Sequence, residues 1–443
     1  MNEKVCVIGA GRIGLPISLV VADEGFEVIA LDRDEELISS LRNKESPFYE
    51  PQMGELLDKH INSNMQLTSD LEKGLKSSDI IIITIGSGLT DENEPDMDNV
   101  WGLLRNLVEY NLKGKLLIFK TTLPMGTTNK IKDFIEEKTD LIGDEDFFMS
   151  FCPERIVEGK AIEELRTLPN IIGGIGRNST EKTSKFMKNF GGNIIEFQNP
   201  TAAEFVKLID NTYRITKFGY SNDLAYIAEV YDLDVFDIID AANEGYDRNQ
   251  VPYPSCGVTG YCLTKDPHYL ENSFKGISES RGFSSVWYYA RKSTDHREKY
   301  SYQQIKKVLE KQKIDLNEAN VLVCGITYKE NVDDIRMSHG SNLADKLYED
   351  GANISVWDPW VDDKTLNYDL YRKPNKAFMD KDIAIFTVPH TQFQEVASNG
   401  KIKNYIEKME NKVIFDGWGL FRDVDFNNPI IYFGTGLSNI NYE

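Results

Sequence analysis

A glycine-rich turn between a predicted strand and a predicted helix is the feature that most constrains the fold of this chain. Residues 5–8 are continuously apolar, and Gly9, Gly11 and Gly14 follow at the spacing G-x-G-x-x-G. An apolar helical pattern comes next, and then a second apolar stretch that ends at Asp32. Strand, glycine turn, helix and strand in this order predict a βαβ unit of the kind that binds dinucleotides.

Each position in this turn has a physical role in such a unit. Gly9 permits the tight turn, Gly11 lets the backbone approach a pyrophosphate, and Gly14 lets the helix pack closely on the strand. Asp32 can accept hydrogen bonds from ribose hydroxyls and would repel a 2′-phosphate, so NAD is favoured over NADP, although Arg33 could soften that preference. A turn of this kind can also be purely structural. The candidate cofactor-binding residues here are Gly9, Gly11, Arg12, Ile13, Gly14, Asp32 and Arg33.

Strand and helix patterns alternate through the first part of the chain. Apolar segments of strand length lie at residues 80–85, 116–119 and 147–151, with helix-like segments between them. This alternation predicts a parallel, doubly wound sheet. From about residue 201 to 242 the apolar residues recur at helical spacing instead, so a long helix is expected to divide two α/β lobes.

The second α/β lobe is predicted to begin near Asn317. One apolar stretch ends at Gly325 and another at Asp358, a spacing that echoes the first βαβ unit. Because the full glycine fingerprint is missing, we expect this lobe to bind something other than a second NAD. The predicted fold is α/β, with two Rossmann-like, doubly wound parallel-sheet lobes joined by a long central helix and a helical domain. The predicted boundaries are 1–199, 200–299 and 300–443.

Charge and cysteine content limit the partners and the compartment. Lysine and arginine number 50 against 71 acidic residues, which gives a formal net charge of −21. A surface this acidic repels polyphosphates, so we expect no nucleic-acid partner. We find no signal region or apolar segment long enough to span a bilayer, and expect no membrane partner. Five widely spread cysteines favour a reducing compartment, the cytoplasm, and no cysteine or histidine spacing indicates a metal site.

Two residues of the central helix could stabilise negative charge. Lys207 and Asn211 fall one turn apart on the same helical face as Glu204. An ammonium and an amide in this arrangement could hold a developing oxyanion. The alternative is a solvated Glu204–Lys207 ion pair with no catalytic role.

Cys262 lies in a glycine-flanked polar loop, with Lys265 and Asp266 three and four residues later. A cysteine in such a loop can be exposed and partly ionised, whereas the cysteines within apolar runs are expected to be structural. A nucleophilic and a structural role both remain possible for Cys262, and Cys256 competes for the nucleophilic one.

Glu154 and Glu158 follow the predicted strand at 147–151. They would lie at the carboxyl end of the sheet, where doubly wound folds place their active sites. Either carboxylate could act as a base or position a water molecule. Either could instead be an acid favoured at a helix N-terminus.

Together these motifs resemble the nucleotide-sugar 6-dehydrogenase family, which oxidises UDP-glucose, UDP-N-acetylmannosamine or GDP-mannose. The resemblance covers essentially the whole chain, and the N-acetylhexosamine branch is the most similar. It implies an NAD-dependent, four-electron oxidation of the C6 alcohol of a UDP-sugar to the uronate, and a homodimer formed through the connector helix. The matching segments are 9–16, 120–128, 153–155, 204–214, the Cys262 loop and 328–336.

The resemblance also implies a role for each catalytic position. Cys262 resembles the thiol that carries the thiohemiacetal and the thioester, and Lys207 and Asn211 resemble the pair that stabilises the oxyanion. Asp266 and Thr122 resemble the residues that hold the catalytic water.

The remaining implied roles concern carboxylates and ligand contacts. Glu158 resembles the base that acts with the catalytic water, and Glu154 its partner near cofactor and substrate. Lys207 and Asn211 are also expected to contact the substrate. The further substrate-binding candidates are Glu154, Arg248, Gly260 and Lys329, and the further cofactor-binding candidates are Ser87, Thr122 and Arg336.

Departures from the family pattern leave the substrate open. The loop before the cysteine carries Ser255, Cys256 and Thr259 in place of a proline and two glycines, and its path could differ because threonine avoids positive φ. Trp418 stands where an arginine is common near the substrate. UDP-glucose and GDP-mannose are therefore alternatives to a UDP-N-acetylhexosamine. Two other classes also remain: a two-electron hydroxyacid-type dehydrogenase that needs no thiol, and a catalytically inactive nucleotide-sugar binding protein.

Overall fold

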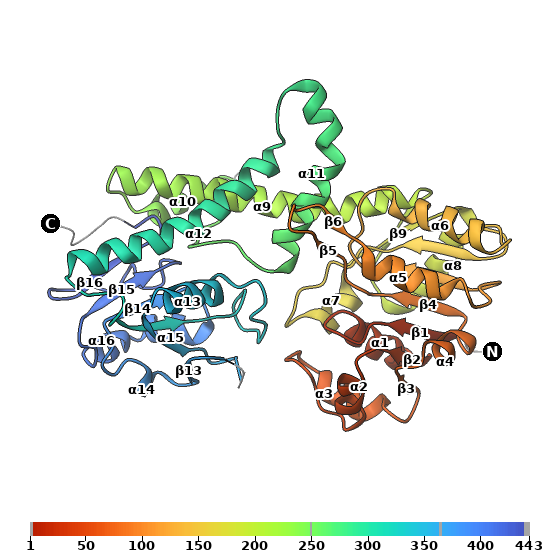
Figure 1. Ribbon diagram of the computed structural model, residues 1–443, viewed down its shortest axis with the longest axis horizontal. Helices are drawn as coiled ribbons and strands as arrows, with labels where there is room; N and C mark the ends of the chain where they lie inside the picture. Colours follow the sequence, from red (N-terminus) through yellow and green to blue (C-terminus); the bar gives the residue numbers. More distant parts are fainter. Residues whose placement is uncertain (1–2, 249, 363–365, 438–443) are drawn as a thin grey trace. The chain divides into compact units, whose positions relative to one another are not determined.

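The structure of the chain, a computed structural model, is shown in Figure 1. It describes residues 3–248, 250–362 and 366–437. These residues form two compact units, and the long helices α9 (Pro200–Val230) and α11 (Tyr261–Arg281) contribute residues to both. The first unit comprises the chain up to Asp210 together with His268–Ile277, and the second comprises Asn211–Pro267 together with the chain from Ser278 onward.

The described part of the first unit is built on an eight-stranded sheet with the order β10-β9-β8-β7-β4-β1-β2-β3. The stretch β3-β2-β1-β4-β7-β8 has the strand order of the Rossmann fold, which confirms the predicted first lobe. The strands are β1 (Lys4–Ile8), β2 (Glu27–Leu31), β3 (Met65–Thr68), β4 (Ile80–Ile83), β7 (Leu116–Phe119), β8 (Phe148–Phe151), β9 (Asn170–Gly174) and β10 (Ile194–Phe197).

Continuous apolar runs place these strands at the centre of the unit. Every residue from Val5 to Ile8 in β1 and from Ile80 to Ile83 in β4 is at most 2% exposed. Strands of a parallel sheet are covered on both faces, so they are apolar at every position rather than at alternate ones. The helices of this unit are α1 (Gly14–Asp23), α2 (Glu35–Arg42), α3 (Met53–His60), α4 (Leu71–Lys76), α5 (Asp98–Leu107), α6 (Thr127–Lys138), α7 (Ala161–Thr167) and α8 (Arg177–Met187).

One pairing differs from the parallel arrangement that we expected. β8 and β9 are antiparallel, with Ser150 opposite Gly174, whereas all other neighbouring strands of this sheet run parallel. An antiparallel neighbour needs no crossover helix, and the connection here holds only the short helix α7. A small antiparallel hairpin, β5 (Gly88–Leu89) and β6 (Pro95–Asp96), also follows β4.

The second unit carries a six-stranded sheet within its described residues, and all of its strands are parallel. Its order, β13-β12-β11-β14-β15-β16, is again that of the Rossmann fold, so the predicted second lobe is confirmed. The strands are β11 (Asn320–Cys324), β12 (Asn353–Trp357), β13 (Asp369–Tyr371), β14 (Ile383–Phe386), β15 (Val413–Asp416) and β16 (Ile431–Gly434), and the helices are α13 (His339–Glu349), α14 (Pro374–Ala377), α15 (Thr391–Ser398) and α16 (Ile402–Ile406).

Helices separate the strands of the first sheet from those of the second along the sequence. Besides α9 and α11 these are α10 (Val235–Asn243) and α12 (Val286–Lys311), and α12 runs through the predicted boundary at residue 300. Gly219 of α9 permits close packing on α12, because a Cβ there would lie 2.7 Å from the Cα of Ala290. No helix within the described ranges is both long enough and apolar enough to span a membrane.

The two Rossmann sheets share one construction at the turn after their first strand. In the first, Gly9 has φ +102°, and a Cβ on Gly14 would lie 1.7 Å from the Gly9 carbonyl oxygen. In the second, Gly325 has φ +88°, and a Cβ on Gly340 would lie 2.3 Å from the Gly325 oxygen. Glycine is therefore required at both positions in both units.

The acid after the second strand distinguishes the two units. Asp32 is half-buried, whereas Asp358 is fully buried. One oxygen of Asp358 accepts a hydrogen bond from Ile326 N at 2.8 Å and lies 3.3 Å from His390 Nε2. The other accepts from the backbone N–H groups of Trp360 and Val361. The hydrogen-bond partners of Asp358 are therefore supplied by the protein itself.

Candidate active site

The glycine turn of the first unit has the geometry of a phosphate-binding turn. Gly9 holds a positive φ, and Gly14 allows α1 to approach the turn. A Cβ added to Gly11 would meet nothing within 4 Å, so this exposed position leaves open space beside the start of α1. The N–H groups at a helix N-terminus favour a phosphate in such a space. The residues therefore fit a dinucleotide.

Asp32 is held in place by two backbone N–H groups. Its Oδ2 accepts a hydrogen bond from Ala10 N at 2.7 Å, and its Oδ1 accepts one from Asp34 N at 3.1 Å. Each carboxylate oxygen can accept two hydrogen bonds, so Asp32 retains the capacity to bind hydroxyl groups. Arg33 is exposed and Ile13 is half-buried.

The two loops that follow β4 and β7 are tied together. Ser87 is buried, and its hydroxyl donates to the carbonyl oxygen of Thr122 at 2.6 Å, while the hydroxyl of Thr121 donates to the Ile85 oxygen at 2.8 Å. In the same unit, the Tyr269 hydroxyl donates to the Gly88 oxygen at 2.7 Å. The structure thus gives Ser87 an anchoring bond to the backbone of Thr122, and its contact with the cofactor stays a prediction.

Glu154 lies at the centre of a buried charged cluster after β8. Its Oε2 lies 3.0 Å from the Nζ of Lys120, and its backbone carbonyl accepts a hydrogen bond from the ammonium of Lys207. All three side chains are less than 10% exposed. Burial alone would raise the pKa of the Glu154 carboxyl. The charge and hydrogen bond of Lys120, with the N–H groups of Ile156 and Arg155, outweigh burial and hold this pKa below its usual value.

Lys120 is a residue that our sequence interpretation missed. It directly follows β7 and therefore lies at the carboxyl end of a central strand. Glu154 and Glu158 were predicted as site residues because they follow a strand in the same way. That positional signal was available in the sequence. Burial raises the pKa of the neighbouring Cys152 thiol to about 12, against the opposing charge of Lys120.

Glu158 faces the glycine turn. Its Oε2 lies 3.3 Å from Nη1 of Arg12, and both side chains are about one-fifth exposed. The guanidinium of Arg12 also lies over the ring of Phe48, 5.0 Å from its centroid. The predicted base and a predicted cofactor-binding residue are therefore neighbours in this structure.

The alternative of a solvated Glu204–Lys207 pair is wrong. Glu204 is fully buried, and its carboxylate accepts hydrogen bonds from Gly126 N at 2.5 Å and from the backbone and side chain of Thr128 at 2.7 and 2.5 Å. It thus satisfies N–H groups at the start of α6. The ammonium of Lys207 instead donates to the backbone carbonyl of Glu154. The spacing of residues along one helix could not predict this contact, because Glu154 lies outside that helix.

In the second unit, the side chains of Asn211 and Asp266 are hydrogen-bonded to each other. The amide Nδ2 of Asn211, on α9, donates to Oδ2 of Asp266, on α11, at 2.6 Å. Oδ1 of Asp266 lies 3.0 Å from the ammonium of Lys265. Asn211 is 5% exposed and Asp266 is fully buried.

Cys262 alone is exposed among the five cysteines, all of which lie in the described part of the chain. It stands in the first turn of α11, which follows Gly260 as N-cap. The rival nucleophile, Cys256, is fully buried, with its Sγ 3.7 Å from the carbonyl oxygen of Thr387. A nucleophile must be accessible to its substrate, so the burial of Cys256 argues against a nucleophilic role for this residue.

The altered loop before Cys262 is accommodated without strain at threonine. Thr259 has no positive φ, and its hydroxyl oxygen accepts a hydrogen bond from His339 N at 3.2 Å. The left-handed position falls on Gly260, whose φ is +93° and whose N–H donates to the Met337 oxygen at 2.9 Å. A Cβ on Gly260 would lie 2.5 Å from the ring of Tyr328, so this position needs glycine.

The other predicted ligand contacts lie in loops of the second unit. Arg336 pairs with Asp334 through two guanidinium nitrogens at 2.7–3.1 Å, and its side chain is 64% exposed. Lys329 is half-buried. Arg248 is exposed and lies over the ring of Tyr246 at 4.5 Å. Trp418, in place of the expected arginine, donates from Nε1 to the Thr387 oxygen at 2.8 Å.

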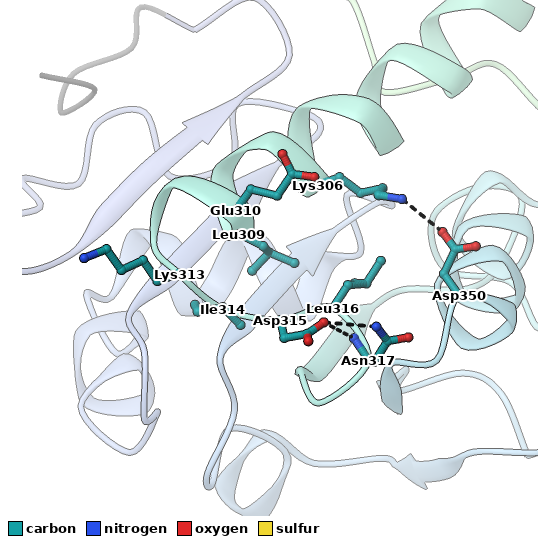
Figure 2. A pocket seen from close by; sticks show the side chains of 9 residues that line it. All are labelled: Lys306, Leu309, Glu310, Lys313, Ile314, Asp315, Leu316, Asn317 and Asp350. Carbon is teal, nitrogen blue, oxygen red and sulfur yellow. Dashed lines mark hydrogen bonds and ion pairs between the residues drawn. The ribbon is translucent and has the colours of Figure 1, made fainter.

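A surface hollow of about 640 Å³ lies elsewhere in the second unit (Figure 2). Figure 2 shows its cation Lys306 directed at Asp350, with 3.5 Å between Nζ and the carboxylate, and Asp315 bonded to Asn317. Lys306 and Asp350 thus pair with each other, and the lining of the hollow includes none of the predicted site residues. Within the described ranges, no group of three or more metal-ligating side chains is arranged to hold a metal ion.

Comparison with known proteins agrees with this geometry. Residues 3–191 match the NAD-binding domain of the UDP-glucose/GDP-mannose dehydrogenase family, residues 201–286 its central domain and residues 322–423 its UDP-binding domain. A UDP-N-acetyl-D-mannosamine dehydrogenase of Methanococcus vannielii is 30% identical over 94% of this chain and 92% of its own. The chain belongs to the UDP-glucose/GDP-mannose dehydrogenase family. As a member, it is an NAD-dependent nucleotide-sugar dehydrogenase, as the resemblance implied.

Solved structures show that the family fold extends over the whole chain. The UDP-N-acetyl-D-mannosamine dehydrogenase of Pyrococcus horikoshii has a TM-score of 0.88 at 27% identity, covering 99% of this dehydrogenase and 100% of that chain. The UDP-N-acetyl-mannosamine dehydrogenase Cap5O of Staphylococcus aureus has a TM-score of 0.84 at 26% identity, covering 98% of both chains.

Proposed function

We propose that this dehydrogenase oxidises the C6 alcohol of UDP-N-acetylmannosamine, or of another UDP-N-acetylhexosamine, to the uronate through covalent intermediates on Cys262. The observation that carries the proposal is the exposure of Cys262, alone among the cysteines, in the first turn of α11. A thiolate at a helix N-terminus is favoured by the helix dipole. The choice of sugar rests on the similar proteins, which are named UDP-N-acetyl-D-mannosamine dehydrogenases.

The first oxidation converts the alcohol to an aldehyde. Bound NAD supplies the hydride acceptor for this step and for the second one. Glu158, through a water molecule held by Asp266 and Thr122, takes the hydroxyl proton as the hydride leaves C6. Glu154 acts as the partner of Glu158, and the pKa of its carboxyl, held below the usual value, keeps it ionised at neutral pH.

The second oxidation proceeds on the protein. The Cys262 thiolate adds to the aldehyde carbon, and the oxyanion that forms is stabilised by the ammonium of Lys207 and the amide of Asn211. Loss of a second hydride from this thiohemiacetal gives a thioester. Water then attacks the thioester carbon, the C–S bond breaks, and the carboxylate and the thiol are released.

The binding residues complete the proposal. For the nucleotide sugar they are Glu154, Lys207, Asn211, Arg248, Gly260 and Lys329. For NAD they are the glycine-turn residues with Asp32, Arg33, Ser87, Thr122 and Arg336. The three domains would extend over 1–199, 200–299 and 300–443, and a reducing cytoplasm would keep the nucleophile a thiol.

We also propose a homodimer formed through α9. Five large side chains on this helix are 40–62% exposed although they are apolar or aromatic. Their spacing of four, four, seven and seven residues places them on one face, and such a face favours association. We call this set the α9 stripe; it comprises Phe205, Ile209, Tyr213, Tyr220 and Ile227.

Counting NADH per sugar tests the chemistry. With UDP-N-acetylmannosamine, UDP-glucose and GDP-mannose offered separately, we expect two NADH per uronate and the highest kcat/KM for the first. Cys262→Ser should abolish the second oxidation, while Cys256→Ser, a matched change at a buried thiol, should still yield two NADH. Undiminished turnover by Cys262→Ser with one NADH per substrate would identify a two-electron dehydrogenase. Tight sugar binding with no NADH from any of the three would identify an inactive binding protein.

A further inference from the structure

The first turn of α11, which carries Cys262, has a backbone defect that a side chain on α12 repairs. Pro267 lies inside α11 and has no N–H to donate to the carbonyl of Leu263, four residues earlier. Nη1 of Arg291 points at this carbonyl from α12, with 3.4 Å to the Leu263 oxygen. The same nitrogen donates to the carbonyl oxygen of Val258 at 3.2 Å.

Arg291 is itself held in place. It is only 5% exposed, and its Nε donates to Oδ1 of Asp295, one turn later on α12, at 2.9 Å. Its two carbonyl partners belong to residues of a small apolar cluster. The cluster comprises Ile215, Val258 and Leu263, with Phe218 and Trp287 packed against them. Burial and the bond to Asp295 already restrict the guanidinium of Arg291. It therefore loses little further conformational entropy when it donates to a carbonyl.

The two carbonyls bracket the reactive cysteine along the chain. Val258 precedes the turn at Gly260, and Leu263 follows Cys262 directly. One guanidinium nitrogen therefore joins the loop to the helix at the point where the thiol stands.

We propose that Arg291 is a positioning residue for Cys262: it fixes the junction between the Val258 loop and α11 and thereby holds the thiol in its reactive orientation. The proposal rests on the proposed function in assigning catalysis to Cys262. The effect of Arg291 on the reactivity of the thiol is inferred only from its contacts with Val258 and Leu263.

Arg297 offers a matched control on the same helix. It is also buried, with no exposed surface, and it also pairs with a carboxylate, that of Glu229. Its other neighbours are the rings of Tyr226 and Tyr300 rather than the Cys262 loop. Arg→Lys at either position keeps the charge and removes the planar fork, and only the Arg291 variant loses a contact with the junction.

The test compares native-state alkylation of Cys262 by iodoacetamide with steady-state kinetics in the full-length protein. The other four cysteines are buried, so early alkylation reports Cys262. We expect Arg291→Lys to slow alkylation and lower kcat by about tenfold each, with KM for NAD unchanged, because a small misplacement of a reacting group is costly. Arg297→Lys should leave alkylation and kcat within twofold of the parent.

Equal alkylation and kcat in the two variants would overturn the proposal. If Arg291→Lys does not fold, Asp295→Asn, which frees the guanidinium at a half-exposed position, decides: a drop of about threefold in both readouts supports the proposal and no change overturns it. Full turnover by Cys262→Ser would refute the proposed function, while the alkylation comparison would still judge the role of Arg291.

Discussion

The side-chain amide of Asn211 donates to Asp266 at 2.6 Å, and this hydrogen bond joins the central helix α9 to α11, the helix that carries Cys262 in its first turn. Both side chains are buried, and they come from positions 55 residues apart. The contact orients the amide, whose second N–H can then point at the oxyanion of a tetrahedral intermediate.

Asn211→Ala should therefore lower kcat by about 10²–10³ with a smaller effect on KM, because removal of one oxyanion donor has a cost of that size. The measurement is steady-state NADH formation. Asn243→Ala is the control, since the side chain of Asn243 is likewise hydrogen-bonded, twice to the backbone of Val251, but lies outside the proposed site. It should lower the melting temperature with kcat retained. Similar kcat losses in both variants would contradict the assigned role.

Asp32 and Asp34 provide a paired test of the cofactor site. Asp32→Ala removes the acceptor for the ribose hydroxyls and should raise KM for NAD by about tenfold or more, the usual cost of a hydrogen bond to a charged group. Asp34 instead caps α2 through the N–H groups of Glu36 and Leu37. Asp34→Ala should cost about 1 kcal/mol of stability and leave KM for NAD unchanged. An unchanged KM in Asp32→Ala would show that the ribose is held elsewhere.

The Rossmann lobes were predictable from the sequence because their central strands are apolar at every position. The four isoleucines of β4, for example, indicate a strand covered on both faces. Gly9, Gly14 and Asp32 were predictable for a related reason, since the turn fixes their spacing along the chain.

The contacts of Glu204 and Lys207 were not predictable in this way. Helical spacing correctly placed the two residues on one face, but their partners, Thr128 and Glu154, come from other elements. Such partners leave no periodic pattern in the sequence. The antiparallel pairing of β8 with β9 was hidden for the same reason, because an apolar segment does not reveal the direction of its neighbour.

Lys120 should control the pH dependence of the reaction through Glu154. Lys120→Met would remove a charge and a hydrogen bond that oppose the effect of burial, so the pKa of the Glu154 carboxyl should rise. The carboxylate would then be protonated at a higher pH, and the acidic limb of the profile of kcat/KM against pH should move to higher pH. Lys120→Arg keeps the charge and should leave the limb near its original position. An unmoved limb in Lys120→Met would exclude this coupling.

The α9 stripe predicts an effect on assembly. Ile227→Glu combined with Tyr220→Glu would place two charges on the proposed interface, where burial of unpaired charge is unfavourable. Light scattering should show the dimer mass for the parent and the monomer mass for the double variant. Met379→Glu, at a side chain that is 52% exposed and outside the stripe, should leave the mass unchanged. A parent protein that is monomeric at micromolar concentration would refute the interface.

The enclosure of Asp358 by His390 and backbone N–H groups has a consequence for the timing of the reaction. Each of the two Rossmann units described in this chain has an acid after its second strand. Of these two acids, only Asp32 retains the capacity to accept hydrogen bonds from a ribose. Under the proposed function, both hydride transfers to NAD would use this one site, so NADH would leave and a second NAD would bind between the two oxidations. The aldehyde intermediate would have to stay bound during that exchange, and a covalent bond to the sulfur of Cys262 would retain it.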